Sequence, residues 1–470
     1  MEGEKQKVVI VGGGITGLTA AYYLQEEIKK KNLPIEYKLI EASRRLGGKI
    51  QTIHKDGFLI ERGPESFQAN KKSILKLAEK VGMQNLLVHN ASMTSFVVAN
   101  EKLYSIPNDV SVGIPRQISP FIATGLFSLA GKMRAAADFL LPRSNESRDQ
   151  SLGKFFRRRF GNEVVENLIE PLLSEIYAGD IDQISLMSTF PQFFEVEKKY
   201  RSLLIGMKKT FSHEDENGSN GFLTFKNGLE SFVESIEKEL EADSVMKGIR
   251  VQSIVKHPEK NVYHISLNDG EKLQADSVIV ALPHYLLPDL FSNDHLFAPF
   301  RNFPTTSVAT IVMAFPENAI KHDINGTRFV VSRNSDYTIN ACTWTHKKWP
   351  HSTPYGKVLL RCFVGRAGDE TVVDLSDAEI EQVVLDDLKK VMDITEKPLF
   401  TIVSRWKHAM PQYTVGHLDR MADFYENVRK ELPGMFITGS SFNGISIPDC
   451  IEQGESVVNQ ILQYLKTSSN

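Results

Sequence analysis

Three glycines close to the N-terminus have the spacing that binds the diphosphate of a dinucleotide. The motif GGGITG occupies residues 12–17, directly after the apolar segment 8–11 and before a helical pattern. Gly12 permits a tight turn, Gly14 lets the main chain approach a diphosphate, and Gly17 lets the helix pack closely on the strand. We therefore expect a diphosphate at a helix N-terminus, where free N–H groups and the helix dipole favour negative charge.

An acidic residue extends this pattern. A second strand is predicted at 37–40 and ends at Glu41. A carboxylate in that place can accept a hydrogen bond from a ribose hydroxyl. The order of strand, glycines, helix, strand and acid predicts a Rossmann-type unit.

Three further segments indicate a flavin rather than a nicotinamide. Segment 42–49 (ASRRLGGK) carries a second glycine pair that can close over a diphosphate from its other side, and 61–67 (ERGPESF) can present main-chain N–H groups to a flavin ring. Segment 438–454 starts a helix whose N-terminal dipole would stabilise negative charge on a reduced flavin.

Length and composition describe an ordinary globular chain. With 470 residues, two or three domains are expected. Lys and Arg number 55 and Asp and Glu 58, so the net charge of −3 offers no electrostatic basis for binding nucleic acid. The chain has three cysteines without metal spacing, so we expect a reducing compartment, the cytoplasm, with no disulfide and no metal site. The first strand begins too early to leave room for a signal or transit peptide.

Two segments allow more than one interpretation. The apolar segment 114–141 predicts a helix with a wide apolar face, which either is buried or lines a groove, or rests on a membrane surface. The triple arginine at 157–159 predicts a solvated helix face, with attraction of an anionic substrate or lipid as the alternative.

The two ends of the chain share one pattern. A strand at 435–438, Gly439 and a helix to about residue 465 repeat the strand, glycine and helix of the N-terminus. We expect both ends to meet on one cofactor, with the middle inserted between them. The other predicted elements are strands at 250–255, 262–267, 277–281, 307–315, 328–332 and 358–364 and a helix at 377–392.

Several longer segments resemble a known family. Segments 170–180 (EPLLSEIYAGD) and 406–413 (WKHAMPQY), together with the tripeptides at 227–229 and 281–283, are similar to signatures of the flavin-containing amine oxidase superfamily. Within it, the chain resembles the bacterial protoporphyrinogen and coproporphyrinogen III oxidases. The similarity spans nearly the whole chain.

This resemblance implies a mixed α/β (α+β) fold in three domains. A Rossmann-type FAD-binding domain is expected at 1–70, 222–292 and 431–466. A substrate-binding domain with a mixed sheet is expected at 71–109 and 293–430. A helical cap domain at 110–205 completes the chain, with membrane association as an option.

The motifs and the resemblance together imply a set of site residues. The expected cofactor-binding residues are Gly12, Gly13, Gly14, Ile15, Thr16, Gly17, Glu41, Ala42, Gly48, Lys49, Gly63, Pro64, Glu65, Ser66, Val251, Trp406, Gly439, Ile445, Ser446 and Ile447. For the substrate, Lys71 is expected to pair with a propionate and Ile176 to line an apolar cleft. The alternatives are a solvated lysine at 71 and plain core packing at 251 and 406. No catalytic side chain is expected, because flavin N5 accepts the hydride directly.

The implied reaction is the six-electron oxidation of a porphyrinogen to a porphyrin, with dioxygen as the acceptor and hydrogen peroxide as the second product. Coproporphyrinogen III is favoured over protoporphyrinogen IX, since the former is water-soluble. The monoamine-oxidase branch of the superfamily joins its flavin to a cysteine shortly after the corresponding tryptophan. Segment 406–418 contains no cysteine, so the resemblance implies non-covalent FAD. The implied partners are the porphyrinogen, dioxygen and a ferrochelatase that takes the product, with at most peripheral membrane contact.

Three alternatives remain at this point. A flavin amine oxidase or carotenoid-type desaturase is disfavoured by the missing cysteine and by the absence of an aromatic residue from 444–448. A flavin-binding module without turnover would bind the same cofactor. A nicotinamide dehydrogenase shares only the first glycine motif.

Overall fold

Five parallel strands from distant parts of the chain form the sheet that carries the glycine motif. The computed structural model describes residues 5–468, except 107–109, 112–113, 116–122, 145–147, 212–220, 292–293 and 322–323. The strand order is β12-β2-β1-β16-β22, so β16 joins strands from the two ends of the chain, as expected. The strands are β12 Val245–Lys247, β2 Ile35–Glu41, β1 Gln6–Val11, β16 Ser277–Val280 and β22 Met435–Ile437.

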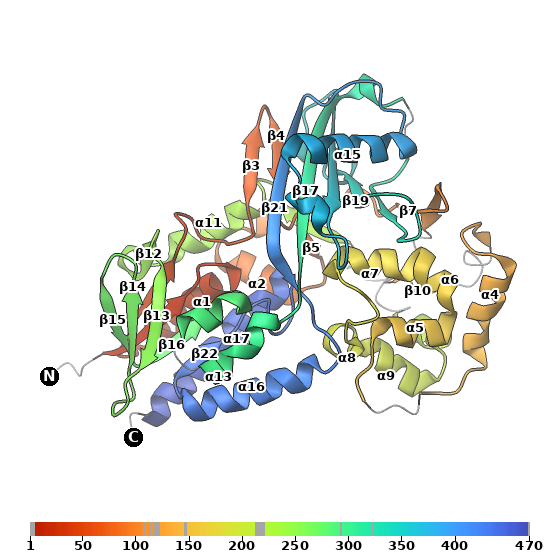
Figure 1. Ribbon diagram of the computed structural model, residues 1–470. Helices are drawn as coiled ribbons and strands as arrows, with labels where there is room; N and C mark the ends of the chain where they lie inside the picture. The colour runs from red at the N-terminus through yellow and green to blue at the C-terminus, as the bar shows by residue number, and fades with distance from the viewer. Residues whose placement is uncertain are drawn as a thin grey trace.

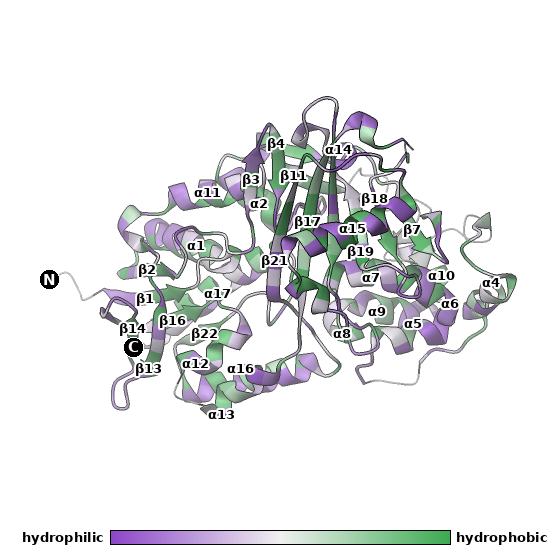
Figure 2. Ribbon diagram, turned by 45° about the horizontal axis from the view of Figure 1, so that its top comes forward, coloured by the Kyte–Doolittle hydropathy of each residue, from purple (hydrophilic) through white to green (hydrophobic). Residues whose placement is uncertain are grey.

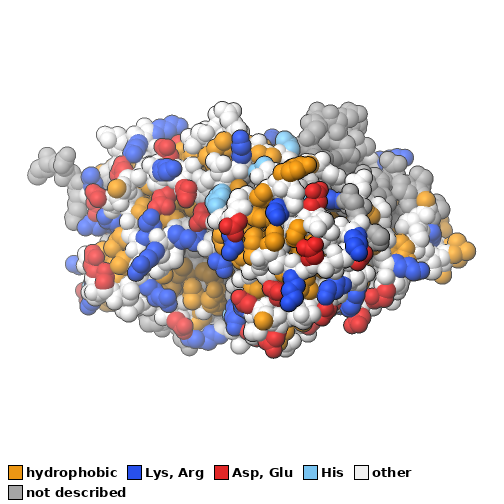
Figure 3. Space-filling model, turned by 90° about the horizontal axis from the view of Figure 1, so that it is seen from above, with side chains coloured by type: hydrophobic (Ala, Val, Ile, Leu, Met, Phe, Trp, Pro, Cys, Tyr) orange, Lys and Arg blue, Asp and Glu red, His pale blue; other side chains and the backbone are white. Residues whose placement is uncertain are grey.

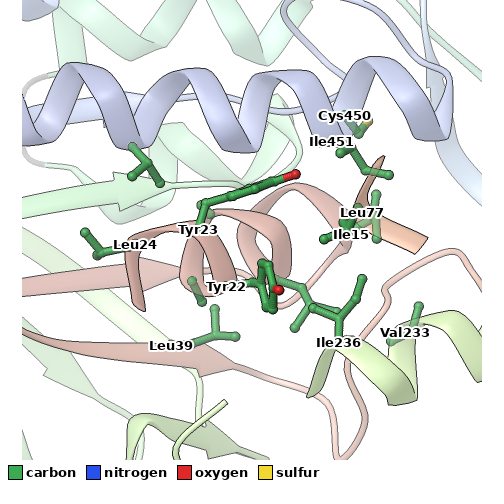
Figure 4. Close-up of a cluster of buried hydrophobic side chains, with 14 of the residues drawn as sticks. Ile15, Tyr22, Tyr23, Leu24, Leu39, Leu77, Val233, Ile236, Cys450 and Ile451 are labelled. Carbon is green, nitrogen blue, oxygen red and sulfur yellow. The ribbon is translucent and has the colours of Figure 1, made fainter. Parts of the chain in front are cut away.

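Helices from both ends of the chain share one hydrophobic core beside this sheet. Helix α1 (Ile15–Lys31) packs along α17 (Ile447–Ser468), and α11 (Leu229–Glu239) packs against α1. Figure 4 shows Tyr23 of α1 beneath α17, and Tyr22 of the same helix near Ile236 of α11. All three side chains are buried, so the core holds the N-terminal and C-terminal segments together.

Two small antiparallel sheets flank the parallel one. The first has the order β13-β14-β15, and the second has the order β5-β11-β6. The strands predicted at 250–255, 262–267 and 277–281 are confirmed, and only the third of them joins the parallel sheet. The bounds are β13 Val251–Lys256, β14 Tyr263–Leu267, β15 Lys272–Ala275, β5 Phe67–Gln68, β11 Phe222–Phe225 and β6 Leu87–His89.

A seven-stranded mixed sheet forms the upper part of the molecule (Figure 1). Its order is β21-β17-β20-β19-β18-β7-β8, and all neighbours are antiparallel except β18 and β7. Helix α15 (Asp377–Val391) covers one face with an apolar stripe, and Ser376 begins it with a capping box. The strands are β21 Phe400–Pro411, β17 Thr305–Pro316, β20 Lys357–Val364, β19 Ile339–Trp344, β18 Arg328–Val331, β7 Ser95–Ala99 and β8 Lys102–Ile106.

A hairpin packs on the same sheet beside β17 and β20. Its strands are β3 (Thr52–Lys55) and β4 (Phe58–Glu61). Phe58 and Ile60 of β4 form a small core with Val312 and Leu359 of the sheet. Figure 2 shows the hydrophobic residues gathered in the strands and the hydrophilic ones along outer helices such as α16 (His417–Glu431).

Short helices form the third part of the molecule, on the right in Figure 1. The segment from α6 to α7 is continuous and contains a π-helical turn, η3, just before Pro171. Proline has no N–H to continue an α-helical ladder, which explains the turn at this place. The helices are α4 Leu129–Ala136, η2 Ala137–Phe139, α5 Leu152–Phe160, α6 Asn162–Val164, η3 Val165–Ile169, α7 Glu170–Tyr177, α8 Leu186–Thr189, α9 Pro191–Tyr200 and α10 Leu203–Phe211.

The single long helix predicted at 114–141 is wrong. Residues 114–115 form a strand, residues 124–128 are not helical, and helix α4 begins at Leu129, where Ser128 accepts a hydrogen bond from the Gly131 N–H at 3.0 Å. Part of the predicted apolar face, residues 121–122, lies outside the described residues. Leu129, at 74 % exposure, does not belong to a buried face.

The solvated face predicted at 157–159 is wrong for Arg159, whereas Arg157 and Arg158 are partly exposed. Arg159 is fully buried and pairs with Glu197 and, at 3.2 Å, with Asp138. Arg158 reaches Glu197 at 2.6 Å. Positive charge on this helix therefore holds three helical segments together, because buried charges require partners.

Shorter elements connect these parts. They are α2 Lys72–Lys80, η1 Gln84–Leu86, β9 Val110–Ser111, β10 Ile114–Pro115, η5 Ala242–Ser244, η6 His284–Leu286, α12 Leu287–Leu290, α13 Asp294–Phe297, η7 Ala298–Asn302, η8 Glu317–Ala319, α14 Thr345–Lys348, η9 Pro350–Ser352 and η10 Thr371–Asp374. Within the described ranges, every helix is too short or too polar to cross a bilayer. Acidic and basic side chains are interspersed on the face in Figure 3, in keeping with the small net charge.

Candidate functional site

A cavity of about 2970 Å³ is bordered by the parallel sheet, the helical region and the seven-stranded sheet. All the residues predicted for cofactor and substrate line it, apart from Gly13 and Gly17. The structure thus brings the predicted residues together from segments that lie far apart in the chain.

The glycine motif forms the turn between β1 and α1. Gly12 has a φ of +103°, which favours glycine. A Cβ at Gly17 would overlap the Gly12 carbonyl oxygen, so this residue keeps helix and strand in close contact. A Cβ at Gly14 would meet nothing within 4 Å and would point into the open site. Gly14 is also the N-cap of α1, which turns the free N–H groups of that helix toward the cavity.

Glu41 stands at the end of β2 beside this turn. Its carboxylate accepts the N–H of Gly13 at 2.7 Å and the N–H of Ser43 at 2.8 Å. The second glycine pair is next to it, because the Gly47 N–H donates to the Gly13 carbonyl at 2.8 Å. The two glycine segments therefore lie side by side at one end of the cavity.

Lys49, next to the second glycine pair, and Trp406 both lie against Gly63. Lys49 donates from Nζ to the Ala409 carbonyl at 2.5 Å, and burial lowers the pKa of its ammonium group. The Trp406 indole on β21 donates to the Arg62 carbonyl at 3.0 Å. A Cβ at Gly63 would overlap the Lys49 carbonyl, so the glycine lets these segments pack together.

The pKa values of the two glutamates on either side of Gly63 are shifted in opposite directions. Burial raises the pKa of Glu61 to about 7, although the Leu229 N–H and the Thr52 hydroxyl donate to its carboxylate. Glu65 is also buried, but Lys348 and Arg361 overcome the effect of burial and hold its pKa at about 2.

The C-terminal segment borders the cavity with main chain. Gly439 has a φ of +120° and donates to the Gln453 side chain at 3.0 Å. The Tyr413 hydroxyl donates to the Ser440 carbonyl at 2.6 Å. The residues predicted at 445–447 lie just before and at the start of α17, so the N-terminus of this helix faces the cavity.

The remaining predicted residues are placed as follows. Lys71 is the N-cap of α2, and its Nζ lies 3.0 Å from the Asp449 carboxylate. Ile176 on α7 is 41 % exposed and lines the cavity. Val251 begins β13 at the end of the cavity near Glu41 and is buried.

A row of polar side chains crosses the large sheet and was not predicted from the sequence. Ser95 of β7 pairs with Arg328 of β18, then come Thr343 of β19 and Arg361 of β20. Residues directly opposite one another point to the same face, and all four line the cavity. The signal was absent because Ser95 and Arg328 are 233 positions apart and only their register brings them together.

The residues around the glycine segments and the start of α17 fit a dinucleotide. Open space at Gly14 and Gly439, the N-terminus of α1, which has no side-chain cap, and the carboxylate of Glu41 match a diphosphate and a ribose. The residues predicted for FAD are thus grouped as such a cofactor requires.

Comparison with known proteins adds independent evidence. Residues 15–462 match the family described as flavin containing amine oxidoreductase. The chain is 52 % identical to a coproporphyrinogen III oxidase of Bacillus subtilis over 99 % of this chain and 100 % of that protein. It is 41 % identical to a coproporphyrinogen III oxidase of Staphylococcus aureus over 98 % and 100 %.

Solved structures agree with this similarity. A crystal structure from Exiguobacterium sp. 255-15, provisionally named a protoporphyrinogen oxidase, superposes with a TM-score of 0.87 at 37 % identity, covering 98 % of this chain and 99 % of the other. Reduced UDP-galactopyranose mutase superposes with a TM-score of 0.73 at 14 % identity, over 98 % and 96 %. The second likeness concerns the fold alone.

Proposed function

The chain belongs to the flavin containing amine oxidoreductase family, and on that premise we propose that it oxidises a porphyrinogen to a porphyrin with non-covalent FAD and dioxygen. The favoured substrate is coproporphyrinogen III, the molecule in the names of the relatives at 52 % and 41 % identity, and protoporphyrinogen IX is the second. The proposal includes hydrogen peroxide as a product, a cytoplasmic location and transfer of the porphyrin to a ferrochelatase.

The observation that carries this proposal is the size and composition of the cavity. A pocket for one drug-sized ligand measures about 300–1,000 Å³. A cavity of about 2970 Å³ has room for a dinucleotide and a broad second ligand. The space beyond the cofactor wall is bordered by apolar side chains, which suit a flat apolar macrocycle. Those side chains are Ile106, Leu172, Ile176, Phe190 and Phe363.

The cofactor would be held by the chain's own main chain and a few side chains. In this assignment the N-terminus of α1 and the glycines at 47–48 bind the diphosphate, Glu41 binds a ribose, and Val251 contacts the adenine. Gly63, Trp406 and the start of α17 surround the ring. When bound, the flavin supplies hydride acceptance and reoxidation by dioxygen.

The protein's task is then to bind, orient and exclude water. The apolar side chains on α7 and β20 remove the macrocycle from water and hold its bridging carbon toward the cofactor wall. Lys71 is a candidate partner for a propionate, although its ammonium group already pairs with Asp449 at 3.0 Å.

The decisive experiment offers the purified protein coproporphyrinogen III, protoporphyrinogen IX and putrescine in air. We expect porphyrin fluorescence with both porphyrinogens, a faster rate with coproporphyrinogen III, and no peroxide with putrescine. Heat-inactivated protein measures spontaneous oxidation. Peroxide from putrescine alone would show an amine oxidase, and bound flavin without any turnover would show a binding module.

The state of the cofactor needs a separate measurement. Acid precipitation should release all the flavin into the supernatant, because no cysteine lies between 406 and 418 to bind it covalently. Flavin absorbance in the washed precipitate would contradict the non-covalent assignment.

A further inference from the structure

The row across the seven-stranded sheet contains two arginines, Arg328 and Arg361, with Thr343 between them. Strands lie about 4.8 Å apart, so the two arginines start about 10 Å from each other on one face. Both line the cavity.

The two guanidinium groups differ in their exposure and in their partners within the protein. Arg361 is 5 % exposed, lies 3.2 Å from the Glu65 carboxylate and donates to the Gly63 carbonyl, so it holds the predicted flavin loop. Arg328 is 24 % exposed. Its Nε donates to the Ser95 hydroxyl at 3.1 Å and its Nη1 to Glu175.

Arg328 keeps one donor free. In the part of the chain that the structure describes, its Nη2 makes no hydrogen bond. Its acidic partner Glu175 is on α7, is 20 % exposed and lines the same cavity. Because this ion pair lines the cavity and its guanidinium has an unused donor, an incoming carboxylate can bind Arg328 beside Glu175 or in its place.

We propose that Arg328 binds a carboxylate of the substrate and that Glu175 competes with that carboxylate; this inference rests on the proposed function. A guanidinium binds a carboxylate through two parallel N–H groups, which gives both charge and direction. On the sheet, Arg328 stands two strands, about 10 Å, from Arg361, which holds the loop at Gly63. It therefore selects a broad ligand with acids on its rim over a small amine.

The two residues of the pair have opposite roles, which distinguishes a binding site from a structural ion pair. If Arg328 only supported the fold, Arg328→Gln and Glu175→Gln would both weaken the same contact and act in the same direction. If Arg328 binds the ligand, Arg328→Gln weakens binding and Glu175→Gln strengthens it.

The chain supplies a control ion pair between the same strand, at its other end, and the same helix. Arg333, just after β18, lies 3.0 Å from the carboxylate of Glu170 at the start of α7. Neither residue lines the cavity. Arg333→Gln therefore removes a similar charge from a similar place without touching the ligand.

The test uses the full-length, flavin-loaded protein and two probes, coproporphyrin III with four carboxylates and its tetramethyl ester. Titration followed by porphyrin absorbance gives the affinity. For coproporphyrin III, we expect Arg328→Gln to weaken binding about tenfold, the loss of a charge-assisted hydrogen bond. We expect Glu175→Gln to strengthen it and Arg333→Gln to leave it unchanged. None of the three should alter binding of the ester.

Folding is checked by flavin content and melting temperature. If Arg328→Gln does not fold, Arg328→Lys keeps the charge without the fork and should weaken coproporphyrin III binding to a smaller extent. Equal affinity of the wild type and the Arg328 variant, or an equal loss with the ester, would overturn the inference.

Oxidation of coproporphyrinogen III by the wild type is measured in parallel. If the wild type turns it over while the Arg328 variant binds coproporphyrin III like the wild type, only the present inference fails. If the wild type neither binds nor oxidises the tetrapyrrole, the proposed function fails and the inference fails with it.

Discussion

The two walls of the cavity, the cofactor wall around the glycine segments and the start of α17 and the sheet wall on the seven-stranded sheet, expose different parts of the chain. The cofactor wall uses main chain: Gly14 and Gly439 leave open space, and the helices α1 and α17 begin there. The sheet wall uses side chains: Arg328, Lys348 and Arg361 bring positive charge from three separate segments. A site made from main chain therefore follows from local motifs, whereas a site made from side chains depends on register between distant strands.

Gly17→Val tests the cofactor wall most severely. The new side chain would overlap the Gly12 carbonyl, a main-chain atom that cannot move away cheaply. We expect the free energy of unfolding to fall by more than about 3 kcal/mol, so that little folded protein is recovered. Soluble yield and thermal melting measure this, and a variant as stable as Gly14→Ala would contradict the packing role.

Gly14→Val separates binding from folding on the same wall. Its side chain would point into open space, so the fold should remain close to wild type in melting temperature. The same side chain would occupy the expected place of the diphosphate, so flavin should be lost. Absorbance of the purified protein measures it, and stoichiometric flavin would refute the placement.

Glu65→Gln tests the sheet wall. It leaves Lys348 and Arg361 without their carboxylate in a buried place. Removing one member of such a buried group costs about 3–5 kcal/mol, which chemical denaturation can measure. Asp386→Asn, in the exposed pair with Lys389, is the control and should leave the denaturation curve unchanged.

Glu61→Gln tests whether the raised pKa of Glu61 makes the stability of the protein depend on pH. The folded pKa of about 7 is above the ordinary value of 4.5, so between these values the folded state binds more protons than the unfolded state. Stability should therefore fall as pH rises from about 4.5 to about 7, by up to about 3 kcal/mol. In the variant this decline should be absent from unfolding curves between pH 5 and 8. Parallel pH profiles for the two proteins would show that Glu61 does not titrate there.

Local patterns predicted much of the cofactor wall. The strand before Gly12, the helix after Gly17 and the strand that ends at Glu41 are all present. The family resemblance is confirmed by the match at 15–462. The proposed domain boundaries and the roles of single site residues remain predictions.

The sheet wall was predicted less well. The strand at 328–332 is confirmed as β18, yet nothing in the sequence showed that Arg328 would face a cavity. Strand β21 was missed although it contains Trp406, because its second half carries Arg405, Lys407 and His408 among few apolar residues. Arg159 was predicted to be exposed, because a run of three basic residues does not show that buried acidic residues pair with it in the fold.

The sequence by itself determined the family, the Rossmann-type glycine turn and the grouping of both chain ends, since these depend on short-range spacing and on glycine's main-chain freedom. Only the tertiary structure decided which charges meet: Glu65 with Lys348 and Arg361, and Arg328 with Glu175. The physical reason is that strand register and helix docking set these distances, and both arise from packing across hundreds of residues.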